Sequence, residues 1–200
     1  MLKPIFNKVL FVAGISCAIF MFNSCDDSKE PEPEEIVIDD DYYEFQDFNM
    51  SDYDIPAILS LPDETANIGA STRPEVIHVE DDIKWEISVG PNFELLIEDF
   101  ADISDLIKVE KKELANHDFF DVKYIIDEED LILYERILIA DGSEKAAPTV
   151  GVEHRTYHVF GQKTVDGITY ALESREEGYE KVIIEIMAKS IKSFQALESK

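Results

Sequence analysis

Four histidines are the first candidates for chemistry in this chain, because an imidazole can bind a metal ion or exchange a proton near neutral pH. His154 and His158 are four residues apart, which places two side chains on the same face of a helix. Residues 152–165 predict a strand instead, and strand positions four apart are separated by about 13 Å, too far for one ion. His78 lies in a predicted short strand and His117 at a predicted helix end. We therefore predict surface or cross-strand histidines and no metal site.

Acidic clusters are the second candidate, because carboxylate oxygens are the ligands that Ca²⁺ prefers. The densest clusters are 39–41 (Asp-Asp-Asp) and 127–130 (Asp-Glu-Glu-Asp). Neither follows the twelve-residue calcium loop with its central glycine and final glutamate, so we expect solvated acidic segments and no metal. The chain has 44 acidic residues, too many for any two to be identified as an acid–base pair.

Nucleophiles and phosphate-binding loops are not recognisable. No serine lies in a Gly-x-Ser-x-Gly motif, and Gly142 and Gly151 fit no glycine-rich phosphate loop. Of the two cysteines, Cys17 lies inside an apolar run near the N-terminus, which leaves Cys25 alone downstream. The sequence predicts no catalytic residue and no cofactor.

The first 24 residues have the pattern of an export signal. Lys3 and Lys8 precede an uncharged apolar run at 9–22, which is shorter than the roughly 20 residues of a membrane-spanning helix. Ser24 then lies directly before Cys25. This order resembles the lipobox of bacterial lipoproteins, in which the signal is removed before a cysteine whose sulfur carries a diacylglycerol.

The chain differs from the usual lipobox at one position, and a second cysteine offers an alternative cleavage site. Three positions before the cysteine the family usually has an aliphatic residue, whereas this chain has Phe22, as in looser Bacteroidetes-type lipoboxes. Cleavage before Cys17 would leave the apolar residues 18–22 on the mature chain. The resemblance implies a signal peptide at 1–24, lipidation of Cys25 with palmitate-type chains, and an outer-membrane location on the periplasmic or surface face. The alternative is an ordinary secreted protein with a stray cysteine.

Residues 25–54 predict an acidic tether. Residues 26–54 carry thirteen acids against one base, and Pro31 and Pro33 alternate with glutamate, which favours an extended chain. The acids after the cysteine resemble the export signal of surface lipoproteins in Bacteroidetes, and a solvated linker without a sorting role is the alternative. Five aromatic residues predict that 42–53 docks on the domain or on a partner: Tyr42, Tyr43, Phe45, Phe48 and Tyr53.

The net charge of the chain limits the classes of partner that it can bind. The whole chain carries −26, and the predicted mature chain carries −28, because residues 1–24 hold two bases and no acids. Such a charge repels phosphate backbones and anionic lipid headgroups, which excludes nucleic acid and peripheral membrane adhesion. The expected partners are the membrane, through the lipid on Cys25, and another envelope protein.

Residues 55–200 predict a single α+β domain, an antiparallel sheet of about seven strands packed by two main helices. Apolar and polar residues alternate through most of the predicted strands, and Asp166-Gly167 predicts a type I′ hairpin turn. The first predicted helix has Asp102 or Ser104 as N-cap, Asn116 as C-cap, and one apolar face: Ile103, Leu106, Ile107 and Leu114. The second has a capping box, Ser174-x-x-Glu177, and an apolar stripe that includes Tyr179, Ile183, Ile186, Met187, Ile191 and Phe194.

The order of these elements, with the hairpin residues 166–170 (Asp-Gly-Ile-Thr-Tyr) and the helix end 188–194, resembles the PsbP-like fold. The resemblance covers about 140 residues and rests on element order and two short motifs. It implies a domain that binds other proteins, and it transfers no catalytic residue to this chain.

Two functions follow from these observations. The first is a non-enzymatic, lipid-anchored binding or assembly subunit of the cell envelope. The second is an envelope hydrolase or small-molecule binder whose site is scattered over the sheet. A deep pocket with convergent polar groups and perturbed carboxylates would favour the second, and a shallow surface with apolar patches would favour the first.

Overall fold

The computed structural model describes five stretches of the chain: 44–63, 73–79, 83–140, 144–145 and 155–197. The predicted signal segment, Cys25, the acidic residues 39–41 and His154 lie outside them. The described residues form two α-helices and two antiparallel sheets, so the predicted α+β class is confirmed. Among these residues, neither helix is long and apolar enough to cross a membrane.

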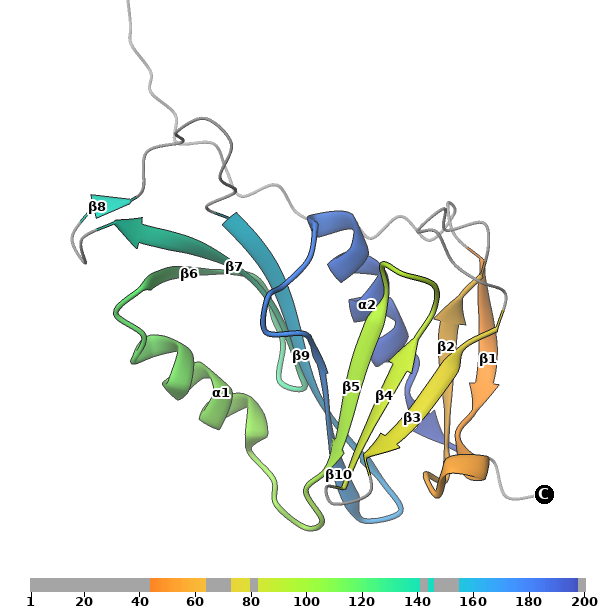
Figure 1. The fold of residues 1–200 in the computed structure, drawn as a ribbon. Helices are drawn as coiled ribbons and strands as arrows, with labels where there is room; N and C mark the ends of the chain where they lie inside the picture. The colour runs from red at the N-terminus through yellow and green to blue at the C-terminus, as the bar shows by residue number, and fades with distance from the viewer. Residues whose placement is uncertain (1–43, 64–72, 80–82, 141–143, 146–154, 198–200) are drawn as a thin grey trace, which may run out of the picture. The chain divides into compact units, whose positions relative to one another are not determined.

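The larger sheet is antiparallel throughout (Figure 1). Its spatial order is β3 (Glu75–Val79), β4 (Lys84–Ser88), β5 (Glu94–Asp99), β10 (Ile168–Ser174), β9 (Arg155–Val165), β7 (Leu131–Ala140) and β6 (Phe120–Asp127), with β8 (Glu144–Lys145) paired to β7 beyond that path. The smaller sheet has the order β1 (Phe45–Asn49), β2 (Ala57–Pro62) and β11 (Gln195–Ala196), with a short 3-10 helix at Ser51–Tyr53. The two α-helices are α1 (Leu106–Ala115) and α2 (Lys181–Ser193).

The two faces of the larger sheet pack against different elements, because successive strand residues point to opposite faces. One face packs against α2 and the small sheet around the main core, which includes Ile97 and Leu172. The other face packs against α1, where Leu114 belongs to a second cluster with Ile132 and Phe160. Figure 1 shows α1 and α2 on opposite sides of β9. The face that carries α1 is the one that matters for the site.

The segment with the aromatic residues is part of the fold. Phe45–Asn49 form β1, which pairs with β2, and Met50 is fully buried. Phe45, Phe48 and Tyr53 pack against the main core, which confirms docking on the domain for the described part of 42–53; Tyr42 and Tyr43 lie outside the described residues. Residues 45–53, which the sequence assigned to the tether, therefore belong to the packed domain, because their buried apolar groups offset the cost of ordering them.

The predicted N-caps of both helices are wrong: the N-cap position of α1 is Asp105 and not Asp102 or Ser104, and that of α2 is Glu180 and not Ser174. Ser174 ends β10 and its hydroxyl accepts a hydrogen bond from the Val159 amide (3.2 Å), whereas α2 begins at Lys181 without a side-chain cap. The pairing of β10 with β5 extends to Ser174, which lies opposite Leu95. Ser174 therefore belongs to the sheet and cannot cap α2. At α1, the Gln162 side chain from β9 accepts a hydrogen bond from the Leu106 amide (2.6 Å), so a residue distant in sequence satisfies the helix start.

Two other local predictions are confirmed, and one is wrong. Asp166 and Gly167 have φ values of 52° and 86°, the positive values that a type I′ turn requires. Asn116 is the C-cap of α1. Ile103 was expected on the buried face of α1, but it precedes the helix and is 54% exposed.

The apolar stripe of α2 is predicted to be a main support of the fold, and the structure buries it. Ile186 is 2% exposed in the main core, so Ile186→Ala should lower the free energy of unfolding by about 2–5 kcal/mol through lost burial and a residual cavity. Val182→Ala, at a 39% exposed position of the same helix, is the matched control. Urea denaturation of the two variants measures the difference, and equal midpoints would contradict the packing of α2.

Candidate functional site

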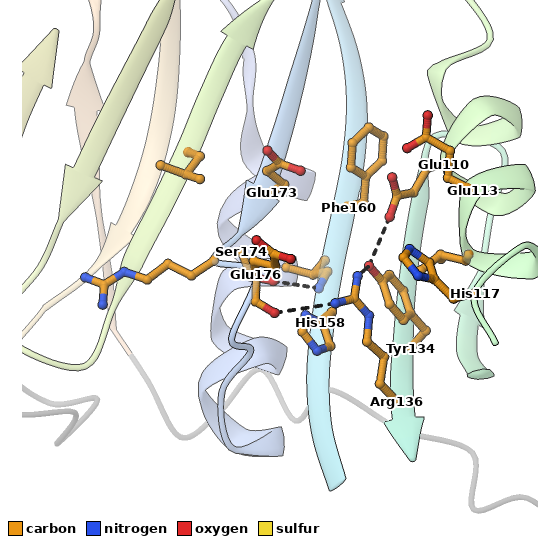
Figure 2. Close-up of a pocket in the computed structure, with 14 residues that line it drawn as sticks. Glu110, Glu113, His117, Tyr134, Arg136, His158, Phe160, Glu173, Ser174 and Glu176 are labelled. Atoms are coloured by element: carbon orange, nitrogen blue, oxygen red, sulfur yellow. Dashed lines mark hydrogen bonds between the residues drawn. The ribbon is translucent and has the colours of Figure 1, made fainter. Parts of the chain in front are cut away.

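A pocket of about 360 Å³ lies between α1 and the sheet face that α1 covers only in part. Its walls come from α1, β5, β7, β9, β10 and the segment after β10. Figure 2 shows the polar side chains that these elements direct toward the same space. The residues that define its chemistry are Glu110, Tyr134, Arg136, His158, Phe160 and Glu173.

Strand register places these side chains side by side. Glu173 on β10 is directly opposite Phe160 on β9, and on its other side it is opposite Leu96 on β5. His158, two residues before Phe160, is opposite Tyr134 on β7. Directly opposite residues of an antiparallel pair have Cβ atoms about 5 Å apart, so the floor of the pocket consists of two adjacent cross-strand rows.

A hydrogen-bonded chain connects α1 to β7 across the pocket. The Tyr134 hydroxyl donates to Glu110 Oε1 (3.0 Å), and Arg136 Nη2 donates to the Tyr134 hydroxyl (3.3 Å) (Figure 2). Arg136 Nη1 donates to the Glu176 backbone oxygen (3.4 Å). Burial, followed by the negative charge of Glu110, raises the pKa of Tyr134, so this phenol stays protonated and acts as a donor.

His158 is a buried structural imidazole. It is 2% exposed and stacks on Tyr134 with ring centroids 5.4 Å apart. Its Nε2 lies 2.8 Å from Thr156 Oγ1, and a second hydrogen bond joins the ring to the Arg175 backbone. Burial, followed by the charge of Arg136, lowers the pKa of His158 to about 3, so the ring is neutral at physiological pH. The prediction of a cross-strand histidine is confirmed here, although the sequence did not indicate its burial.

Among the four glutamates that line the pocket, Glu173 combines partial burial with the lack of a hydrogen-bonding or ion-pair partner among the described residues. Its sheet neighbours, Leu96 and Phe160, have no group that can donate a hydrogen bond. Among the residues that the structure describes, its carboxylate neither accepts a hydrogen bond nor forms an ion pair. Burial, reinforced by repulsion from Glu110, raises the pKa of Glu173 to about 7. This side chain can therefore take up or release a proton near neutral pH.

Of the other described histidines, His117 lines the pocket and His78 does not, and the acidic turn forms ion pairs of its own. His78 stacks on Trp85 at 4.9 Å, and His117 follows α1 at the rim of the pocket. In the described parts of the chain, no three His, Cys, Asp or Glu side chains converge as metal ligands would. Three acids of the 127–130 turn pair with lysines from three different elements: Asp127 with Lys111, Glu128 with Lys192, and Asp130 with Lys163.

Glu173→Gln is expected to stabilise the protein above neutral pH. A carboxyl whose pKa is raised from 4.5 to about 7 on folding binds more protons in the folded state, so the free energy of unfolding decreases as pH rises through that window. The wild type should lose on the order of 2–3 kcal/mol relative to Glu173→Gln between pH 4.5 and pH 8. Urea denaturation across this range measures it, with Glu129→Gln in the exposed turn as the control. An identical pH dependence of the free energy of unfolding in wild type and Glu173→Gln would show that folding does not raise the pKa of Glu173.

The sequence identified none of the charged pocket residues as a site. The sequence predicts His158 and His117 as surface or cross-strand histidines, and most glutamates are not distinguishable from the other acids of the chain. The one signal that could have indicated Glu173 is its place as an acidic residue in the apolar strand 168–174. The predicted lipidation site, Cys25, lies outside the described residues. Comparison of the chain with protein-family models, with curated proteins and with solved structures finds no match in any of the three.

Proposed function

We propose that this chain is a lipid-anchored protein of the cell envelope whose domain binds a small polar molecule in the pocket between α1 and the sheet. The observation that carries the proposal is the pocket itself, where side chains from five secondary-structure elements converge on about 360 Å³ of space. That volume is at the lower end of the range for small-ligand sites. The proposed anchor is supported by the sequence pattern that ends at Cys25.

Most polar groups of the pocket are held in hydrogen bonds within the protein, which favours binding over catalysis. Glu173, which can exchange a proton near neutral pH, is the exception. A catalytic base or nucleophile must be free to exchange a proton with the substrate or to attack it. Here the Tyr134 hydroxyl donates to Glu110, the His158 ring contacts Thr156 and the Arg175 backbone, and the Ser174 hydroxyl accepts from an amide. These groups hold the walls of the pocket in place. A preorganised polar wall of this kind is suited to orienting a ligand.

A protein partner remains the second candidate, because β3 ends the described path of the larger sheet and carries apolar residues in solvent. Ile77 is 56% exposed and Ile83, just before β4, is 59% exposed. Exposed apolar side chains at a sheet edge are typical of protein contacts. If an envelope protein binds there, Ile77→Lys should abolish its co-purification with the anchored chain. Co-purification that persists in this variant would place the contact elsewhere.

Methyl NMR tests the proposed pocket directly. The side chains of Leu96 and Leu114 line it, whereas Leu59 and Leu61 are buried in the main core on β2. When the purified chain is screened against a library of small polar fragments, hits should shift the Leu96 and Leu114 methyl resonances and leave the β2 methyls unchanged. A screen in which no fragment shifts the pocket methyls would contradict the proposal.

A further inference from the structure

The charges that line the pocket are unbalanced. Four glutamates and two arginines line it: Glu110, Glu113, Glu173, Glu176, Arg136 and Arg175. The guanidinium of Arg175 forms a two-pronged ion pair with Glu94, which is not itself a lining residue. The hydrogen bonds of Arg136 go to a phenol and a backbone oxygen. No arginine hydrogen bond of the described chain therefore reaches a carboxylate inside the pocket.

The surroundings of Glu173 indicate which chemical group a ligand would need in order to compensate this carboxylate. The sheet places this carboxylate between Leu96 and Phe160, which cannot compensate it. The charged groups that act on it come from α1 (Glu110), β5 (Glu98), β4 (Lys84) and β7 (Arg136), and Lys84 is 2.8 Å from Glu98 in an ion pair. A partly buried carboxylate without a partner destabilises the folded state, and a cation on a bound ligand would compensate its charge.

Phe160 supplies the apolar part of the same site. Its ring belongs to the cluster under α1 and also lines the pocket, where Figure 2 shows it close to the Glu173 side chain. An aromatic surface next to an anionic oxygen is suited to an ammonium or guanidinium group carried on a short apolar body. The pocket is too small for a large ligand.

We propose that the pocket binds a small organic cation, a primary amine or a guanidinium compound, whose charge pairs with Glu173 and whose apolar body lies on Phe160 and Leu96. This inference rests on the proposed ligand-binding function and adds the class of ligand to it. The bound cation favours the ionised form of Glu173, so binding releases a proton from the fraction of molecules in which Glu173 is protonated. The affinity for the cation accordingly rises with pH.

The test is isothermal titration of the purified full chain with benzylamine and with benzyl alcohol, two probes of similar shape that differ in charge. Benzylamine should bind at least tenfold more tightly than benzyl alcohol. Its affinity should be about tenfold higher at pH 8 than at pH 6, because a carboxyl whose pKa is about 7 changes from mostly protonated to mostly ionised over that range.

Two variants and a third probe complete the test. Glu173→Gln should weaken benzylamine at least tenfold, remove the pH dependence and leave benzyl alcohol unchanged, whereas Glu129→Gln should change nothing. Equal affinities of the two probes, no binding of benzylamine, or full binding by Glu173→Gln would overturn the inference. Neutral fragments that still shift the pocket methyls would then preserve the proposed function without the cation. If a lysine-containing peptide binds more tightly than benzylamine, the proposal of a small-molecule ligand is overturned, and the pocket binds a lysine side chain of a protein instead.

Discussion

Gly161→Ala should lower the free energy of unfolding by about 3 kcal/mol or more. Gly161 lies in β9 on the face that packs against α2, and a Cβ atom built there would be 2.3 Å from Cγ2 of Ile191. Ile191 is fully buried, and its β-branched side chain has little freedom to rotate away. The added methyl group must therefore displace α2 or bend β9, and both changes disturb the main core.

A double-mutant cycle assigns the cost to this contact. Ile191→Ala removes the clashing Cγ2 atom. The double variant should therefore lose less free energy of unfolding than the sum of the losses of the two single variants. Gly167→Asn is the control for glycine replacement, because no atom lies within 4 Å of its Cβ position and asparagine tolerates the positive φ there. Additive losses in the cycle, measured by urea denaturation, would contradict the close approach of α2 to β9.

Cys25→Ala should abolish membrane association. The proposed anchor depends on the lipid carried by this one sulfur, and two or more acyl chains hold a protein stably whereas none leaves it in solution. Cys17→Ala is the matched control, because it removes the other cysteine from inside the apolar run of the signal. Detergent phase partition of cell fractions should find the Cys25→Ala protein in the aqueous phase and the Cys17→Ala protein in the detergent phase. Cys25→Ala protein that stays in the membrane pellet would refute the lipoprotein proposal.

Local sequence patterns predicted most of the fold. Alternation of apolar and polar residues located β4 and β5, the Asp166-Gly167 pair located the β9–β10 turn, and the apolar stripe ending at Phe194 located α2. Each of these signals acts within one or two elements, where the period of side-chain burial depends only on the type of element. The strand order, in which β10 lies between β5 and β9, has no such local signal.

The helix starts were mispredicted for a tertiary reason. Ser174 has the residue type and spacing of a helix cap, but the ladder between β10 and β5 extends to it. The start of α1 is completed by Gln162, more than fifty residues away in the sequence. Capping rules describe the residues next to a helix, so they cannot anticipate a cap from another strand.

The pocket could not be predicted because its residues become neighbours only through the strand register. Glu110 and Glu173 are on α1 and β10, and His158 meets Tyr134 only because β9 pairs with β7 in one alignment. With 44 acidic residues in the chain, neither glutamate differs from the rest until its burial is known. The unusual property of Glu173 comes from its apolar neighbours in space.

The proposed ligand site is tested most directly by filling the pocket, which should abolish ligand binding. Leu96→Trp places a large side chain in the pocket, whereas Ile77→Trp places it at an exposed position of β3 in the same sheet. We predict that fragments that shift the Leu114 methyl resonances of the wild type no longer bind Leu96→Trp and bind Ile77→Trp normally. Undiminished binding by Leu96→Trp would contradict the claim that the space between α1 and the sheet is the ligand site.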